Sequence, residues 1–259
     1  SIITWPVQIK EFKRVNLVAV DMAGNKSVTK IPFYIKNFVE KTDDIKVSDD
    51  FINSVSRQVL EKSDMKLPFR DKKNSHKGNF GHLNVIVGCK KGAGIIAANA
   101  AFGFGAGLVS IVCHENFELP YHIMQTHFIS ENCTAIAIGM GLGKYETEEI
   151  RKILNKNVAK IIDADLFYDE LICEVLEQEL VLTPHPKEFI SLLKLTNIAD
   201  ISIEELQDNR FLYVEKFCKI YPKVTLLLKG ANVIISKNEK IYVNIFGSSK
   251  LSKGGSGDV

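Results

Sequence analysis

From residue 82 onward, short apolar runs alternate with longer stretches whose apolar positions recur at helical spacing. The apolar runs, which we predict to be strands, are residues 82–88, 108–113, 135–139, 159–163 and 180–183. The stretches that we predict to be helices are residues 92–103, 146–154, 188–195 and 203–221. Strands that alternate with helices are typical of a parallel sheet covered on both faces. We therefore expect an α/β fold with a mostly parallel sheet over residues 76–259.

Three more strands are predicted near the end of the chain. A buried apolar strand ends at Lys229-Gly230, a second runs through residues 233–236, and a third runs through residues 241–246. Ahead of them, Ser202 is the expected N-cap of the helix at 203–221. Glu205, three residues later, completes the pattern of a capping box.

Residues 1–40 have a different pattern, with two alternating runs around Gly24-Asn25 that indicate a β-hairpin. Residues 1–60 resemble an immunoglobulin-like fragment from the segment ahead of the catalytic domain in lysostaphin-type zinc endopeptidases. The His-x-His metal-binding pair of those enzymes is absent, so the resemblance implies no peptidase activity. Immunoglobulin-like modules need about seven strands. We therefore expect residues 1–40 to be a partial β segment whose front is missing.

Residues 41–75 are predicted to link this segment to the α/β domain. Lys41–Asp50 is charged and poor in large apolar residues, which is typical of a linker. Asp50–Leu60 has the spacing of a short helix, and residues 65–74 are basic and extended. We expect a junction between two unrelated pieces of sequence near residues 55–68.

The composition excludes several classes of function. A hydrophobic content of 46% with 25% charged residues is ordinary for a soluble globular protein. The formal net charge of +2 and the lack of a dense basic block argue against binding to nucleic acid. No apolar run is long enough to span a bilayer, so no membrane is expected as a partner. The five cysteines are widely spaced, as expected of reduced thiols in a cytosolic protein.

The segment Lys253–Asp258, which reads Lys-Gly-Gly-Ser-Gly-Asp, carries the densest candidate chemistry. Glycines let consecutive backbone N–H groups point at one spot, and such a loop before a helix binds anions. Beside a bound phosphate, Asp258 is placed to take a proton from an attacking hydroxyl, as phosphoryl transfer requires. Glycine pairs are also common in plain turns, so the motif alone leaves that alternative open.

A series of motifs between residues 76 and 259 resembles the NAD(P)H-hydrate dehydratases, a ribokinase-like family. The motifs, in family order, are His76–Gly81, Gly92–Gly94, Gly105–Val109, Gly139–Gly143, Asp163–Asp165, Leu182–Phe189, Lys229–Ala231 and Gly254–Asp258. In the third glycine-rich motif, Met140 stands where the family usually has proline. The resemblance implies the ribokinase-like version of the α/β fold.

The resemblance also implies a reaction, the ADP-dependent dehydration of (S)-NAD(P)H hydrate to NAD(P)H. This is a repair of damaged nicotinamide nucleotides by a cytoplasmic hydro-lyase. ADP and Mg²⁺ are the implied cofactors, and NAD(P)H hydrate and ADP are the implied partners. The sequence is compatible with a homo-oligomer.

Particular residues carry these implied roles. Asp258 would be the general base, and the implied substrate contacts are Ala93, Gly141, His185 and Asp258. The residues implied to bind the nucleotide are Lys229, Gly230, Ala231, Asn232, Val233, Gly255, Ser256 and Gly257. No residue is assigned to a protein-held metal site.

Each of these residues has a plainer interpretation. Ala93 suits helix packing, His185 suits a rigid turn between two prolines, and Lys229 suits an exposed strand end. Asp163-Ala164-Asp165 is compatible with a water-mediated Mg²⁺ contact and equally with capping of a strand end.

Two alternative functions also remain open. They are a small-molecule kinase of the same fold and a non-catalytic wall-associated module. The order Pro184-His185-Pro186 followed by Glu188 favours the dehydratase.

The chain stops one residue after Asp258, so the family's following helix is not part of the given sequence. Without that helix, the glycine loop lacks the helix dipole that favours bound anions. We therefore expect the α/β domain to be incomplete at its C-terminus and the 259-residue polypeptide alone to be weakly active or inactive.

Overall fold

The computed structural model describes residues 15–20, 26–31, 57–70, 73–143 and 145–259. The chain divides into two compact units, Ser1–Gln58 and Val59–Val259. In the first unit, β1 (Val15–Val20) pairs antiparallel with β2 (Lys26–Ile31). This pair confirms the predicted hairpin, and its turn lies outside the described residues. The rest of the predicted immunoglobulin-like segment and the linker at 41–50 also lie outside them.

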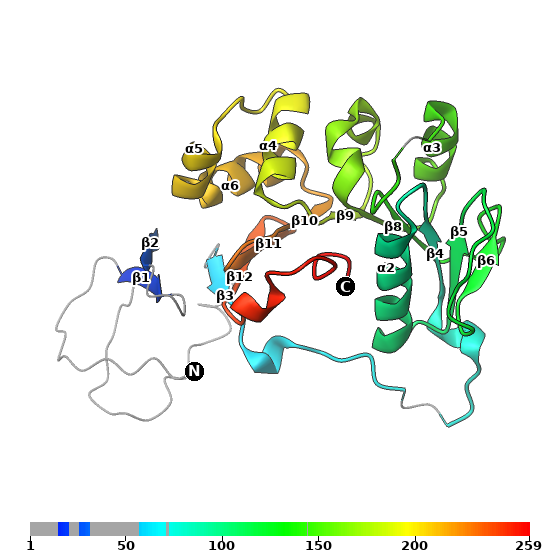
Figure 1. The fold of residues 1–259 in the computed structure, drawn as a ribbon. Helices are drawn as coiled ribbons and strands as arrows, with labels where there is room; N and C mark the ends of the chain where they lie inside the picture. The colour runs from blue at the N-terminus through cyan, green and yellow to red at the C-terminus, as the bar shows by residue number, and fades with distance from the viewer. Residues whose placement is uncertain (1–14, 21–25, 32–56, 71–72, 144) are drawn as a thin grey trace. The chain divides into compact units, whose positions relative to one another are not determined.

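A ten-stranded sheet with the order β3-β12-β11-β10-β9-β8-β7-β4-β5-β6 organises the second part of the chain (Figure 1). Its strands are β3 (Arg57–Val59), β4 (His82–Ile86), β5 (Leu108–Val112), β6 (Met124–Thr126), β7 (Ala135–Ile138), β8 (Ala159–Ile162), β9 (Leu180–Leu182), β10 (Val224–Leu228), β11 (Val233–Lys237) and β12 (Lys240–Asn244). Neighbours from β10 through β6 are parallel, whereas β10, β11 and β12 form an antiparallel meander. The expected mostly parallel sheet is confirmed.

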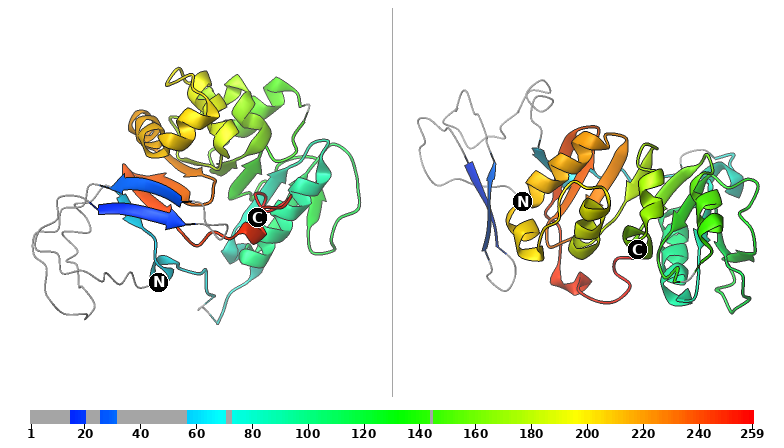
Figure 2. Two further views of the ribbon diagram at one scale, coloured as in Figure 1. Left: turned by 60° about the vertical axis from the view of Figure 1, so that its left-hand side comes forward. Right: turned by 90° about the horizontal axis from the view of Figure 1, so that it is seen from above.

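Helices pack on both faces of the sheet, as predicted (Figure 2). They are α2 (Lys91–Phe104), α3 (Thr147–Leu154), α4 (Pro186–Leu195), α5 (Ile203–Asp208) and α6 (Arg210–Ile220). Alternate residues of β4 separate the two cores: Val85 belongs to a cluster with α2, whereas Ile86 belongs to a larger cluster with α3, α4 and α6. This alternation is what a strand buried on both faces requires.

Two sequence predictions about helices were wrong. The helix expected at 203–221 is broken at Asn209, which ends α5 and precedes α6. Ser202 does cap α5 by accepting from the Glu205 backbone N–H at 3.2 Å. The Glu205 carboxylate, however, accepts from the Tyr213 hydroxyl instead of closing a capping box. The carboxylate is therefore engaged with a donor on α6, eight residues further along the chain.

The prediction of a short helix at 50–60 is also wrong for the residues that the structure describes. Residues 50–56 lie outside the described part of the chain, and Arg57–Val59 form strand β3. The neighbouring Leu60 N–H donates to the Val243 carbonyl at 2.9 Å, which continues the pairing with β12. An exposed sheet edge therefore prevails over the local helical spacing. Among the described residues, no helix is long and apolar enough to cross a membrane.

The carboxyl ends of six neighbouring parallel strands, β5, β4, β7, β8, β9 and β10, meet along one edge of the sheet. The residues that follow them there, in the order of the strands, are Cys113, Val87, Gly139, Asp163, Thr183 and Lys229. In open α/β sheets, ligands bind outside this edge. The motifs singled out in the sequence therefore converge where a ligand site is expected.

The larger core gives a direct test of this packing. Phe189 is fully buried, and its ring meets that of Phe217 edge to face at 5.9 Å between centroids. We expect F189A to lower the free energy of unfolding by about 3–5 kcal/mol, because it leaves a cavity. F104A, at a ring that is 66% exposed, should cost about 0.5 kcal/mol or less. Urea denaturation of both variants measures this, and equal losses would contradict the assignment of the core.

Candidate active site

An ion pair between Asp163 and Lys229 lies at the centre of the carboxyl edge of the sheet. The Lys229 ammonium donates to both carboxylate oxygens of Asp163, at 2.8 and 2.9 Å. Asp163 follows β8 and is only 3% exposed, so its charge depends on a close partner. Lys229 follows β10, and its backbone N–H donates to the Pro184 carbonyl at 2.9 Å. The pair therefore joins the ends of β8 and β10 across the loop that follows β9.

Asp258 lies beside this ion pair. Burial raises the pKa of the Asp258 carboxyl, the charge of Asp163 raises it further, and the charge of Lys229 lowers it. A Cβ added at Gly257 would stand 3.4 Å from the Lys229 ammonium nitrogen, so the glycine loop passes directly over Lys229. The proposed base therefore shares one ammonium group with a second, more deeply buried carboxylate.

His185 and Glu188 form the opposite wall of the cluster, at the start of α4. The Glu188 carboxylate accepts from the His185 backbone N–H at 2.7 Å, and His185 Nδ1 accepts from the Glu188 N–H at 3.1 Å. This reciprocal cap fixes the imidazole, which Pro186 also stiffens at the first helical position. Burial raises the pKa of Glu188, and the charge of Asp163 adds to the rise, while His185 and Lys229 oppose it. Glu188 and Asp258 are thus both influenced by the charges of the same ion pair, and His185 is held against Glu188.

The predicted nucleotide stretch, residues 229–233, comprises the turn between β10 and β11 and the first residue of β11. Arg210 supports it from behind, since its guanidinium donates to the carbonyls of Leu228 at 3.5 Å and Lys229 at 3.2 Å. A Cβ at Gly247 would lie 2.3 Å from the Ala231 carbonyl oxygen, so the chain after β12 packs tightly against this turn. The predicted nucleotide residues therefore lie on a braced backbone next to the ion pair.

The glycine loop closes the site from the side of α2. Gly255 has a φ of +85°, and a Cβ there would stand 2.9 Å from Cδ1 of Ile96 on α2. The Ser256 N–H donates to the Lys253 carbonyl at 3.3 Å, and the Asp258 N–H donates to the Gly255 carbonyl at 3.2 Å. The Ser256 hydroxyl is buried without a hydrogen-bond partner. In this structure, the Ser256 amide is therefore engaged within the loop itself.

Ala93 and Gly141, the other predicted substrate contacts, meet at the start of α2. Gly141 has a φ of +66° and its carbonyl accepts from the Lys90 N–H at 3.1 Å. A Cβ at Gly141 would lie 2.4 Å from the Lys90 carbonyl oxygen, so only glycine fits there. Ala93 lies in the first turn of α2 and packs against the smaller core cluster. These two residues lie beyond the Asp163–Lys229 pair, toward β4.

The two aspartates of the Asp163–Asp165 motif have different hydrogen-bonding partners. Asp163 pairs with Lys229, and the Asp165 carboxylate accepts from the Gly143 N–H at 2.9 Å. Within the part of the chain that the structure describes, no group of three or more His, Cys, Asp or Glu side chains is placed to hold a metal ion.

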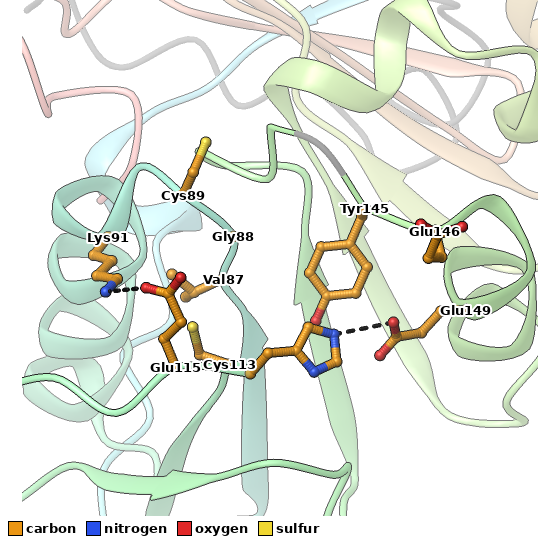
Figure 3. Close-up of a pocket in the computed structure, with 10 residues that line it drawn as sticks. Val87, Gly88, Cys89, Lys91, Cys113, Glu115, Tyr145, Glu146 and Glu149 are labelled. Carbon is orange, nitrogen blue, oxygen red and sulfur yellow. Dashed lines mark hydrogen bonds and ion pairs between the residues drawn. The ribbon is translucent and has the colours of Figure 1, made fainter.

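A separate pocket of about 440 Å³ opens between α2 and α3 at the ends of β4 and β5 (Figure 3). Its lining residues are Val87, Gly88, Cys89, Lys91, Cys113, His114, Glu115, Tyr145, Glu146 and Glu149. Lys91 pairs with Glu115 at 2.8 Å, and His114 pairs with Glu149 at 3.0 Å. Burial raises the pKa of the half-buried Tyr145 to about 12. No sequence motif pointed to this pocket, because its residues come from three separate segments.

Sequence reasoning also overlooked the role of two buried charges. Glu188 stood in a quoted motif without a function, although its place three residues after His185 is the spacing of a capping box. The sequence around Arg210 did not indicate its role, because the carbonyls that it binds lie at the end of β10, 18 and 19 residues further along the chain.

Comparison with known proteins identifies the family. The model of the NAD(P)H-hydrate dehydratase family matches residues 83–259. The chain is 45% identical over 208 residues to the bifunctional NAD(P)H-hydrate repair enzyme Nnr of Helicobacter pylori, across 78% of this chain and 43% of that protein. The chain spans between 40% and 53% of the length of three such bifunctional relatives.

Solved structures agree with the observed fold. A ribokinase-like superfamily protein from Enterococcus faecalis matches with a TM-score of 0.65 and 23% identity, over 78% of this chain and 76% of that one. The ADP/ATP-dependent NAD(P)H-hydrate dehydratase from Bacillus subtilis, co-crystallized with ATP and Mg²⁺, matches with a TM-score of 0.60 and 26% identity, over 74% and 73%. The predicted ribokinase-like fold is confirmed.

These matches give no support to the immunoglobulin-like resemblance of residues 1–60, which stays a prediction. For the remainder, the family model covers well over half of the chain. The chain belongs to the NAD(P)H-hydrate dehydratase family.

Proposed function

We propose that this chain dehydrates (S)-NAD(P)H hydrate to NAD(P)H at the expense of a nucleotide, with ADP as the phosphoryl donor. The observation that carries the proposal is the position of Asp258, a carboxylate with a raised pKa, beside the Asp163–Lys229 pair. A base with a raised pKa is better matched to proton transfer near neutral pH than an ordinary aspartate. The names of the relatives supply the substrate class.

The proposed reaction has two steps. Asp258 removes the proton from the C6 hydroxyl of the hydrate, and the oxygen attacks the terminal phosphorus of ADP, so that AMP leaves. The phosphate then leaves C6 with its electron pair, and a proton leaves C5, which restores the double bond of the dihydropyridine ring. Catalysis of such a transfer rests mostly on positioning and charge stabilisation.

The side chains around the ion pair have matching proposed roles. Lys229 would neutralise the transferring phosphoryl, and the amides of Gly255 and Gly257 would face its oxygens. His185 would contact the hydrate, held in place by its cap with Glu188. Residues 230–233 would hold the adenosine phosphate through their backbone. The proposed mechanism gives no step to a metal held by protein side chains.

The free thiols support a reducing compartment for the proposed enzyme. Cys89, Cys113, Cys133, Cys173 and Cys218 all lie in the described part of the chain, and none forms a disulfide. Reduced cysteines are usual in the cytoplasm, where nicotinamide nucleotides are also used. We therefore place the proposed activity in the cytoplasm.

The reaction itself is the first test. We expect the purified chain, given hydrated NADH and ADP, to restore the absorbance band of the dihydronicotinamide and to release phosphate, at the low rate expected above for the 259-residue polypeptide. D258N should lower the rate by about 10²–10⁴-fold, because the general base is lost. D200N is the matched control, since Asp200 pairs only with Lys194 on the surface, and it should keep the wild-type rate.

Two results would overturn the assignment. One is D258N turning over at the wild-type rate. The other is a wild-type chain that restores no absorbance but phosphorylates another alcohol to a stable product, which would make it a small-molecule kinase.

The pH dependence gives a second test. Asp258 acts only when ionised, so kcat/KM should fall as the pH drops through its pKa, which lies above the usual value for aspartate. In D163N, the negative charge that raises this pKa is gone, and Lys229 no longer has a competing partner. We therefore expect the acidic limb of the profile, and the Asp258 carboxyl titration seen by NMR, to move to lower pH.

D165N is the control for this shift. Asp165 belongs to the same motif, but it binds the Gly143 amide and is not among the charges that shift Asp258. The control should leave the acidic limb where it is. An unmoved or raised limb in D163N would contradict the proposed coupling.

A further inference from the structure

The pocket between α2 and α3 lies outside the cluster assigned to the chemistry, yet on the same edge of the sheet. It begins at the ends of β4 and β5, whereas Asp163 follows β8. Two to three strand spacings separate them, which is about 10–14 Å at about 4.8 Å per spacing. The start of α2 lies between them, where Gly141 contacts Lys90. This separation is shorter than an extended dinucleotide.

The pocket has the features of a nucleoside site. Its volume of about 440 Å³ falls in the range of small-molecule pockets. Tyr145 offers a half-buried ring, and its hydroxyl is buried without a hydrogen-bond partner. Its ring lies 5.1 Å from that of His114, so one aromatic wall is already formed. An aromatic face of this kind suits stacking of a heterocyclic base.

Negative charge dominates the pocket. Lys91 is its only ammonium group among the lining residues, and it is already paired with Glu115. Glu146 and Glu149 add two more carboxylates, of which Glu149 contacts His114. Figure 3 shows Lys91 and Glu115 together on the side of α2, with Tyr145 and Glu149 across the pocket. A carboxylate can accept a hydrogen bond from a ribose hydroxyl, but it repels a phosphate in the same place.

We propose that this pocket takes the adenosine end of the hydrated dinucleotide and selects NADH hydrate over NADPH hydrate. The inference rests on the function proposed above and names the form of the substrate that it did not specify. The 2′-hydroxyl of NADH hydrate lies against Glu115, where the 2′-phosphate of NADPH hydrate would add two negative charges to an acidic wall. The cyclic nicotinamide end lies at Asp258, and the diphosphate passes the start of α2.

Equilibrium binding without a phosphoryl donor tests the selection apart from turnover. We expect isothermal titration calorimetry to give an affinity about tenfold or more higher for NADH hydrate than for NADPH hydrate, because like charges in one site oppose binding. E115Q keeps the shape of the side chain and frees Lys91. It should raise the affinity for NADPH hydrate and bring the ratio of the two affinities close to one.

E118Q is the matched control, because Glu118 is an exposed glutamate three residues further on that does not line the pocket. It should keep the wild-type ratio. Glu115 is itself exposed, so E115Q is expected to fold, which a thermal melt can verify. Equal affinities in the wild type, or a ratio unchanged by E115Q, would overturn the selection while leaving the proposed function intact. A chain that binds neither hydrate would overturn both.

Discussion

A single buried ion pair, Asp163–Lys229, holds the candidate active site together. Taking a carboxylate to 3% exposure costs free energy that only a close, well-aligned cation offsets. The ammonium comes from the far side of β9, so the ends of three strands must be in register before the pair can form. The electrostatics of the site therefore depend on the packing of the sheet. The site exists only in the correctly assembled sheet.

The same ammonium group is shared by more negative charge than it can neutralise. Asp258 and Glu188 both feel Asp163 as a repulsive neighbour and Lys229 as an attractive one. Their raised pKa values follow from burial together with this imbalance. In the proposed reaction, such a cluster would take up a proton from the substrate hydroxyl. It is also the arrangement in which a small change of charge has effects on several groups at once.

The sequence predicted the fold well because its signals were local. The alternation of apolar runs with helical stretches located most helices and the parallel strands other than β6 (Met124–Thr126) to within a few residues. The break at Asn209 and the strand at Arg57–Val59 were missed, because both depend on partners distant in the sequence. For the candidate site, motif order located the loops, but the pairing of Asp163 with Lys229 needs the strand order. The pocket around Tyr145 needs three loops in place at once.

The turn after β7 shows why the backbone itself can require glycine in this motif. A side chain at Gly139 would push its first carbon to 1.8 Å from the carbonyl oxygen of Asp163. The residue is thus dictated by crowding from the neighbouring strand end, and no ligand is needed to account for it. In the same motif, the amide of Gly143 is held by Asp165. In this chain, the glycine signature therefore sets the spacing of the backbone beneath the candidate site, independently of any ligand above it.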